Sequence, residues 1–209
     1  MPTTLLAFHG YTLNGTAMSK QLAELAGALA SHVDIVCPDA PHTCDPASVD
    51  RLYASWGAPR SSAPHLGWWD ATEDGAVYRG WEETRDAARE WTSRFSSVGV
   101  LGFSQGAMLV AALAALSGSE QFPPIRFAIM IGGRKPRAEA LQSLFERTIR
   151  VPSLHVWGDA DRLTGSDAPA LVEHFDPTTR EVFRWAGPHA IPTRGPAAAA
   201  IVDFVRRHA

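Results

Sequence analysis

The chain of 209 residues has only two cysteines, Cys37 and Cys44, and lacks the common metal-binding and phosphate-binding patterns. Two cysteines are too few for a disulfide framework, so a reducing, cytoplasmic location is expected, although one Cys37–Cys44 bridge stays open as an alternative. Neither an H-E-x-x-H zinc motif nor a G-x-x-x-x-G-K-[ST] phosphate loop occurs. The sequence therefore implies no cofactor and no metal.

A strong charge of one sign and long hydrophobic runs are also absent. The formal net charge is −3, with 45% hydrophobic and 20% charged residues, which is typical of a soluble globular protein. This balance offers no basic surface for nucleic acid or an anionic membrane. No apolar run is long enough for membrane insertion, and no basic leader precedes the first apolar segment at Thr4. The expected partner is a small molecule, and the protein is expected to be a monomer or a homodimer.

Short apolar segments alternate with helical patterns along most of the chain. The apolar segments span residues 5–8, 33–36, 98–101, 127–131, 153–157 and 182–185. Helical patterns span residues 18–30, 78–95, 105–116, 138–147, 169–175 and 196–208. Apolar strands separated by helices predict a parallel sheet covered on both faces. We therefore expect a single α/β domain over residues 1–209, with a mostly parallel six-stranded sheet and helices on both faces.

Residues 40–77 interrupt this alternation with a stretch rich in proline, serine and aromatic residues. A structureless connection of this length is uncommon unless it is functional or disordered, and its aromatic content predicts that it is packed. The stretch begins at the carboxyl end of the second strand, where ligands bind in such sheets. We expect Trp68 and Trp69 to contribute walls of an acyl pocket, with burial in the core as the alternative.

Ser104 stands at the centre of Gly102-Phe103-Ser104-Gln105-Gly106, between an apolar segment and an Ala/Leu-rich helical pattern. The bare G-x-S-x-G pattern is weak, but its strand–turn–helix setting predicts a nucleophile elbow that lifts the serine hydroxyl clear of the sheet. The amide of Gln105, at the start of the helix, is expected to form one side of an oxyanion hole.

A serine nucleophile needs a base to take its proton and an acid to orient that base, in the chain order Ser, Asp or Glu, His for this architecture. Asp159 and Asp161 both follow the fifth strand, and Asp159 could be a turn residue. We favour Asp161, because its position further along the loop is better placed to reach the next loop. That loop carries His189, the expected base, for which a plain surface histidine is the alternative.

The first strand ends in His9-Gly10-Tyr11. A histidine here can brace the loop that donates the second oxyanion N–H, which we expect from the amide of Tyr11. His9 is also a candidate substrate-binding residue. His155 lies inside a predicted strand and is expected to be a satisfied core side chain.

Together these motifs resemble the FSH serine hydrolases of the α/β-hydrolase superfamily. The G-F-S-Q-G-A core is shared with carboxylesterases and acyl-protein thioesterases, whereas Trp68-Trp69 and the stretch Y-R-G-W-E-E at residues 78–83 point to this family. Further matching stretches lie at residues 6–15, 155–161 and 187–192, so the resemblance spans nearly the whole chain. It implies an α/β-hydrolase fold with Ser104 as nucleophile, Asp161 and His189 as acid and base, and Tyr11 and Gln105 at the oxyanion hole.

The leading interpretation is a serine esterase or thioesterase that cleaves small carboxyl esters or thioesters through an acyl-enzyme. Two alternatives use the same fold: a related acyl-transfer, perhydrolase or carbon–carbon hydrolase activity, and a non-catalytic ligand-binding protein. The segment at residues 131–136, which contains Arg134 and Lys135, is more basic than expected for the family. That departure concerns substrate identity rather than mechanism.

Overall fold

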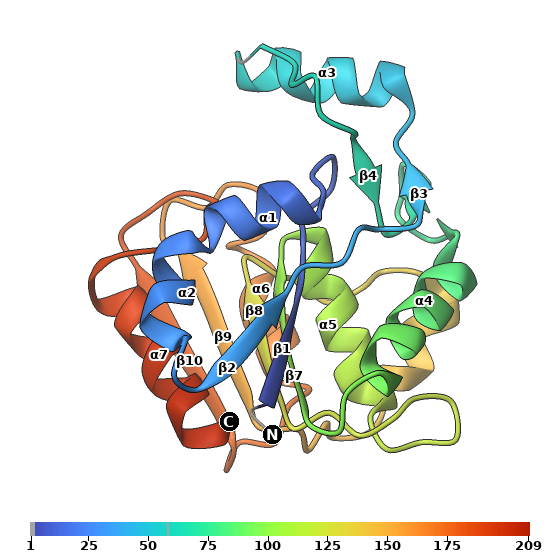
Figure 1. The fold of residues 1–209 in the computed structure, drawn as a ribbon. Helices are drawn as coiled ribbons and strands as arrows, with labels where there is room; N and C mark the ends of the chain where they lie inside the picture. The colour runs from blue at the N-terminus through green and yellow to red at the C-terminus, as the bar shows by residue number, and fades with distance from the viewer. Residues whose placement is uncertain (1–2, 58) are drawn as a thin grey trace.

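A parallel six-stranded sheet forms the centre of the protein in the computed structural model, which describes residues 3–57 and 59–209, with Trp56 described by its backbone (Figure 1). Its strand order is β10-β9-β8-β7-β1-β2, and each neighbouring pair is parallel. The strands are β1 (Thr3–Phe8), β2 (Val33–Val36), β7 (Val98–Phe103), β8 (Phe127–Ile131), β9 (Ser153–Gly158) and β10 (Arg180–Trp185). The predicted six-stranded α/β fold is confirmed.

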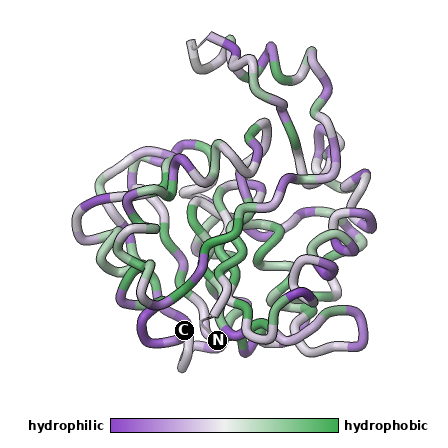
Figure 2. Tube along the Cα trace, viewed as in Figure 1, coloured by the Kyte–Doolittle hydropathy of each residue, from purple (hydrophilic) through white to green (hydrophobic). Residues whose placement is uncertain are grey.

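Helices cover both faces of the sheet, and each face has its own apolar core. On one face lie α4 (Trp81–Ser93), α5 (Gln105–Leu116), the 3₁₀ helix η1 (Glu139–Phe145) and α6 (Ala168–Val172). On the other lie α1 (Gly15–Gln21), α2 (Ala23–Leu29) and α7 (Gly195–His208). Figure 2 shows the apolar residues concentrated in the central strands and in α5. Nearly every side of α5 is buried, because it lies between the sheet and the outer elements of its face.

Two predicted helices differ in the structure. The pattern at 18–30 forms two helices that meet at Leu22, which is the last cap of one and the first cap of the other. The pattern near 138–147 forms the 3₁₀ helix η1. There the side-chain amide of Gln142 donates to the carbonyl oxygens of Pro136 and Ala138, at 2.9 and 3.0 Å. A side chain from within the helix thus provides hydrogen bonds to the backbone at its start.

The insertion at 40–77 contains regular structure and rises above the carboxyl edge of the sheet (Figure 1). Its elements are β3 (His42–Thr43), α3 (Pro46–Trp56), β4 (Leu66–Gly67) and β5 (Asp70–Ala71); β3 pairs with β4, and β5 pairs with β6 (Tyr78–Arg79). The side chain of Asp45 caps α3 by accepting the amide of Ser48 at 2.8 Å. Gly57, in the left-handed conformation, ends the helix.

Cys37 and Cys44 are both free thiols. Within the parts of the chain that the structure describes, every helix is too short or too polar to cross a membrane.

Candidate active site

Ser104 lies on a sharp turn between β7 and α5, with φ of 54° and ψ of −114°. Its amide donates to the carbonyl oxygen of Ile131 at 2.9 Å, which ties the turn to the end of β8. A Cβ on Gly102 would lie 2.1 Å from the carbonyl oxygen of Gly106, and a Cβ on Gly106 would lie 2.1 Å from that of Phe8. Only glycine fits at these two positions, so the turn holds the serine in a strained conformation typical of a nucleophile elbow.

His189 and Asp161 come from the loops after β10 and β9 and form a hydrogen-bonded pair. Nδ1 of His189 donates to Oδ2 of Asp161 at 2.7 Å, and the two side chains are 14% and 1% exposed. The imidazole packs beside the ring of Phe103, the residue before Ser104, with centroids 4.9 Å apart. It also lies against Gly132, where φ is 58° and a Cβ would stand 2.9 Å from Cε1 of the ring. The pair therefore lies at the same sheet edge as Ser104.

The carboxylate of Asp161 is held by three further hydrogen-bond donors. Its Oδ1 accepts the amides of Leu163 and Thr164 at 2.8 and 2.9 Å, and the Thr164 hydroxyl lies 2.8 Å from Oδ2. Burial raises the pKa of Asp161, but the hydrogen bonds from His189 and Thr164 outweigh it, so the pKa is lowered. An ionised acid beside Nδ1 fixes the proton there and leaves Nε2 of His189 as the basic nitrogen.

Thr164 was not singled out from the sequence. Its spacing from Asp161 could have indicated it, because Asp-x-x-Thr in a loop is typical of a turn closed by side-chain-to-backbone hydrogen bonds.

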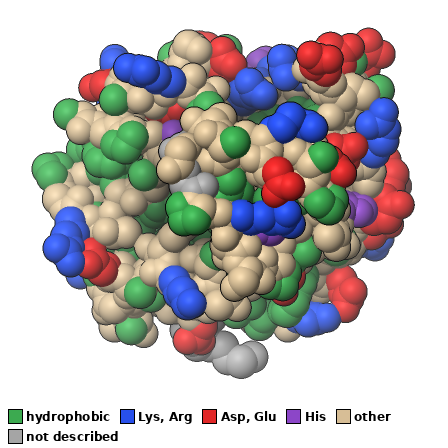
Figure 3. Space-filling view, turned by 90° about the horizontal axis from the view of Figure 1, so that it is seen from above, with side chains coloured by type: hydrophobic (Ala, Val, Ile, Leu, Met, Phe, Trp, Pro, Cys, Tyr) green, Lys and Arg blue, Asp and Glu red, His purple; other side chains and the backbone are tan. Residues whose placement is uncertain are grey.

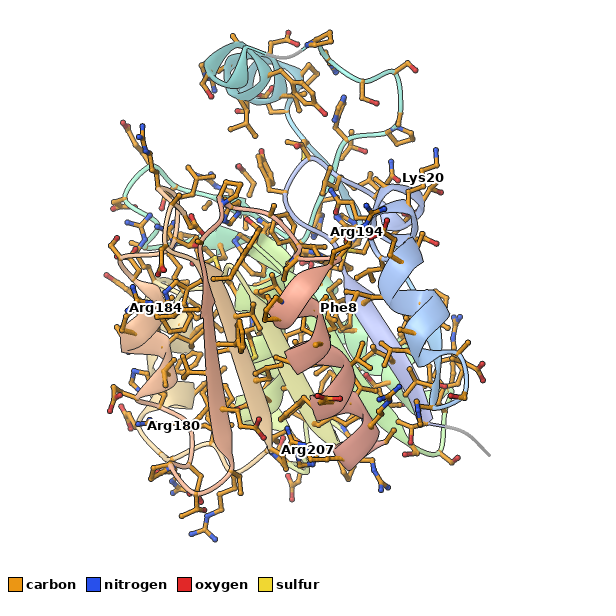
Figure 4. All side chains as sticks on the ribbon, turned by 90° about the vertical axis from the view of Figure 1, so that its left-hand side faces the viewer. Phe8, Lys20, Arg180, Arg184, Arg194 and Arg207 are labelled. Carbon is orange, nitrogen blue, oxygen red and sulfur yellow. The ribbon has the colours of Figure 1, made fainter. Side chains whose placement is uncertain are left out.

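Asp159 is in a different environment. Its Oδ1 accepts from Nε and Nη2 of Arg184 at 2.9 and 2.6 Å, and its side chain is 49% exposed. Arg184 belongs to β10, the edge strand of the sheet (Figure 4). Of the two candidate acids, the structure brings Asp161 to His189 and pairs Asp159 with an arginine at the surface.

The loop after β1 lies directly beside Ser104. A Cβ on Gly10 would lie 3.3 Å from Cβ of Ser104, so the backbone at Gly10 and Tyr11 passes close to the serine. Thr12 has a φ of 66°, a costly conformation for a β-branched residue, and its buried hydroxyl has no partner within the described chain. Its amide donates to the carbonyl oxygen of Leu66 at 2.9 Å, which fixes the loop against the insertion.

His9 braces this loop from beneath. It is fully buried, its Nδ1 donates to the carbonyl oxygen of Gly10 at 2.8 Å, and its Nε2 accepts the amide of Ala40 at 3.1 Å. Burial lowers the pKa of His9, so the ring is neutral. The expectation that His9 contacts substrate does not hold in this structure, because both ring nitrogens are occupied and no part of the ring is exposed.

Trp68 and Trp69 are 1% and 2% exposed and belong to the core. The indole N–H of Trp68 donates to the carbonyl oxygen of His9 at 2.8 Å, so Trp68 is not a pocket wall. Trp69 stacks on Tyr78 with ring centroids 4.6 Å apart, and it also lines a small recess with Tyr11. The pocket role stays a prediction for Trp69 alone.

The side chain of Gln105 joins the elbow to this aromatic pair, a contact that the sequence did not indicate. Its Oε1 accepts the amide of Trp68 and its Nε2 donates to the carbonyl oxygen of Trp69, both at 2.9 Å. Because Gln105 is the first residue of α5, its own backbone amide has no acceptor within the helix. The residue can therefore hold the insertion with its side chain and offer its amide to a bound oxygen.

His155 is a core residue, as its strand position predicted. It is 2% exposed, its Nε2 lies 3.2 Å from the Ser153 hydroxyl, and burial lowers its pKa to about 3. Among the residues described, no cluster of three or more His, Cys, Asp or Glu side chains could hold a metal ion.

Comparison with known proteins agrees with this architecture. The family model described as "Serine hydrolase (FSH1)" matches residues 1–201. Esterase OVCA2 of Homo sapiens is 30% identical, in an alignment covering 100% of this chain and 97% of that protein.

Two plant structures share the fold. Arabidopsis thaliana SOBER1 has a TM-score of 0.72 at 18% identity, covering 100% of this chain and 99% of that one. Zea mays acyl-protein thioesterase 2 has a TM-score of 0.68 at 17% identity, covering 99% and 94%. By its match to the family model over nearly its full length, the chain belongs to the FSH1 family of serine hydrolases.

Proposed function

We propose that this protein is a serine esterase or thioesterase that hydrolyses small carboxyl esters or thioesters through an acyl-enzyme on Ser104. The observation that carries this proposal is the hydrogen-bonded pair of His189 and Asp161, 2.7 Å apart, at the edge of the sheet where the strained Ser104 turn emerges. Strain stored at a serine beside such a pair is typical of a reaction centre.

In the proposed reaction, Nε2 of His189 takes the proton of the Ser104 hydroxyl as Oγ attacks the carbonyl carbon of the substrate. Asp161 keeps the imidazole in the required tautomer and stabilises the imidazolium that forms. His189 then protonates the leaving alcohol or thiol, and the acyl group stays on Ser104. A water molecule, activated by the same histidine, releases the acid and restores the serine.

We assign the stabilisation of the negative charge on the tetrahedral oxygen to the backbone amides of Tyr11 and Gln105. Gln105 begins α5, and the N-terminus of a helix favours negative charge. The fixed loop around Gly10 supports a donor at Tyr11, since preorganised donors need no rearrangement during the reaction.

Both esters and thioesters are retained as the substrate class. The human relative is named an esterase, and one structural neighbour is named an acyl-protein thioesterase. The two reactions share the acyl-enzyme and differ in the leaving group, so one arrangement of Ser104, His189 and Asp161 serves either.

The test is hydrolysis of p-nitrophenyl butyrate and butyryl-CoA by wild type and by Ser104→Ala. We expect the variant to fold normally and to lose activity by about 10⁴-fold or more, because only binding and oxyanion stabilisation remain. Ser93→Ala, at an exposed position of α4, is the matched control and should keep wild-type rates. A purified Ser104→Ala protein that retains most of its activity would refute the proposal.

A further inference from the structure

Arg134 follows the loop that supports the proposed catalytic pair. Ile131, at the end of β8, accepts the amide of Ser104, and Gly132 lies against the ring of His189. The next residue, Gly133, packs on Ala107 of α5, where a Cβ would stand 2.9 Å from the alanine Cβ. Consecutive Cα atoms are about 3.8 Å apart, so the Cα of Arg134 lies within about 8 Å of that of Gly132.

The guanidinium of Arg134 has unused donors. Its Nε is buried and has no acceptor within the described chain. Its Nη1 makes one long contact of 3.5 Å with Oδ2 of Asp167, and the two side chains are 27% and 52% exposed. A largely buried cation with an unsatisfied N–H is unfavourable in isolation, because hydrogen-bonded water has been lost without replacement. A ligand can reach the exposed 27% of the Arg134 side chain.

Tyr78 connects the residues that follow Arg134 to Trp69 and Gln105. The backbone amide of Arg137 donates to the Tyr78 hydroxyl at 3.0 Å, and burial raises the pKa of that hydroxyl. The ring of Tyr78 stacks on Trp69, whose carbonyl oxygen is bound by Gln105. The segment that contains Arg134 is therefore held beside the Ser104 turn at both ends, through Gly132 on one side and through Arg137 and Tyr78 on the other.

The neighbouring cations are less suited to bind a ligand. The guanidinium of Arg137 lies over Gly75, and the residue is exposed. The ammonium of Lys135 lies over the ring of Phe145, 5.6 Å from its centroid. Figure 3, which views the molecule from above Figure 1, shows Lys and Arg side chains scattered among acidic and hydrophobic ones. A preference for an anionic substrate therefore requires one local cationic group.

We propose that Arg134 is a specificity-determining residue that binds an anionic oxygen group, a carboxylate or a phosphate, carried by the substrate. The planar guanidinium offers parallel donors that match the oxygen pair of such a group. The inference rests on the proposed hydrolase function and narrows its substrate class. The anionic group belongs either to the acyl chain or to the leaving group, and the experiment separates the two.

Two matched substrate pairs test the proposal. Mono-p-nitrophenyl glutarate against p-nitrophenyl butyrate places a carboxylate on the acyl side. Butyryl-CoA against S-butyryl-N-acetylcysteamine places phosphates on the leaving side. In Arg134→Gln, the ratio of kcat/KM for the anionic to the neutral member should fall roughly 10- to 100-fold in one pair, as expected for loss of a charged hydrogen bond. Arg134→Lys should show a smaller fall in this ratio, because lysine keeps the positive charge but lacks the paired, coplanar donors of a guanidinium.

Arg89→Gln removes the same charge from an exposed position on α4 and should keep both wild-type ratios. Ratios unchanged in Arg134→Gln, or an equal fall for both members of each pair, would overturn the proposal, since a purely structural role lowers both alike. Failure of the hydrolase function itself would appear differently, as a wild type that cleaves none of the four substrates.

If Arg134→Gln does not fold, the salt response of the wild type decides. With Arg134 as the binding group, kcat/KM for the favoured anionic substrate falls as salt is added, while that for its neutral partner stays constant. Without such a group, the net charge of −3 repels an anion, and added salt would raise the rate instead. A rise, or equal responses for the two members, would contradict the proposal.

Discussion

Ser104 and Thr12 are the two non-glycine residues with positive φ in the described chain, and they lie on adjacent loops. Residues held this way cost about 1–3 kcal/mol each and persist only where the surroundings enforce them. The strain at Ser104 could be predicted, because the glycines at 102 and 106 mark the turn in the sequence. The strain at Thr12 could not, since a threonine after Gly-Tyr carries no such mark.

The assignment of the acid predicts unequal effects for two neighbouring aspartates. Asp161→Asn should lower kcat by about 10⁴-fold, because an amide favours the wrong tautomer of His189 and cannot stabilise its charged form. Asp159→Asn only weakens an exposed contact with Arg184 and should change kcat little. Steady-state kinetics of both variants on p-nitrophenyl butyrate measure the difference. The opposite ranking would move the acid to Asp159.

His155 predicts a pH dependence of stability. Its pKa is lowered from about 6.5 in the unfolded chain to about 3 in the fold, so the unfolded state binds more protons between these values. Stability should therefore fall as pH drops below about 6.5, by at most about 1.4 kcal/mol per pH unit from this residue. The ordinary pKa of Asp161, 3.8, already lies below pH 5.5, and its lowering in the fold keeps the carboxylate ionised from pH 5.5 to 7.5.

The check is urea unfolding of wild type and His155→Gln at pH 7.5, 6.5 and 5.5. Below pH 6.5 the free energy of unfolding of wild type should decline more steeply than that of the variant. Parallel declines would show that His155 is accessible to protons in the folded state.

At the scale of elements, the insertion is attached at several points to the sheet edge that carries Ser104. The side chain of Gln105 binds the backbone of Trp68 and Trp69. His65 links the insertion to the loop after β1, because its Nδ1 lies 2.9 Å from the carbonyl oxygen of Thr12 and its Nε2 lies 3.1 Å from that of Ser61. Through these contacts the insertion supports the turn at Ser104 and the loop after β1. Trp68 therefore acts as packing beneath Ser104, whereas Trp69 packs there and also lines the recess with Tyr11.

This attachment predicts the effect of Gln105→Ala. The change leaves the Trp68 amide and the Trp69 carbonyl without partners and should lower the free energy of unfolding by about 1–3 kcal/mol. It should also speed limited proteolysis within residues 40–77 more than elsewhere. Gln105→Glu, which keeps the acceptor for Trp68 and loses the donor to Trp69, should fall in between. Unchanged stability and an unchanged cleavage pattern in Gln105→Ala would show that the side chain does not hold the insertion.

Helices and strands could be predicted where the residues that determine them lie close together in the sequence. Each sheet strand is an apolar run bounded by polar or turn residues, so all six were found from pattern alone. Helix α3 was missed, although Asp45-Pro46 and apolar positions at 49, 52, 53 and 56 carry a start signal and helical spacing. In η1 the side chain of Gln142 binds the carbonyl oxygens of Pro136 and Ala138, a contact that no periodicity reveals.

At the scale of the whole molecule, loops after β1, β7, β9 and β10 converge on one edge of the sheet. Chain order and strand ends predict that Ser104, Asp161 and His189 share this edge, because parallel strands direct their carboxyl ends to one side. The burial of Trp68 and the occupied nitrogens of His9 arise from packing between the insertion and the sheet. Such contacts between distant segments leave no local trace in the sequence.

The most direct test of the account is mass spectrometry of the wild-type protein after reaction with a fluorophosphonate. Ser104, if activated by His189 and Asp161, should carry a single covalent adduct located by peptide mapping, and Asp161→Asn should form it far more slowly. Absence of an adduct in folded wild-type protein, or an adduct on another residue, would contradict the claim that Ser104 is the nucleophile of a serine hydrolase.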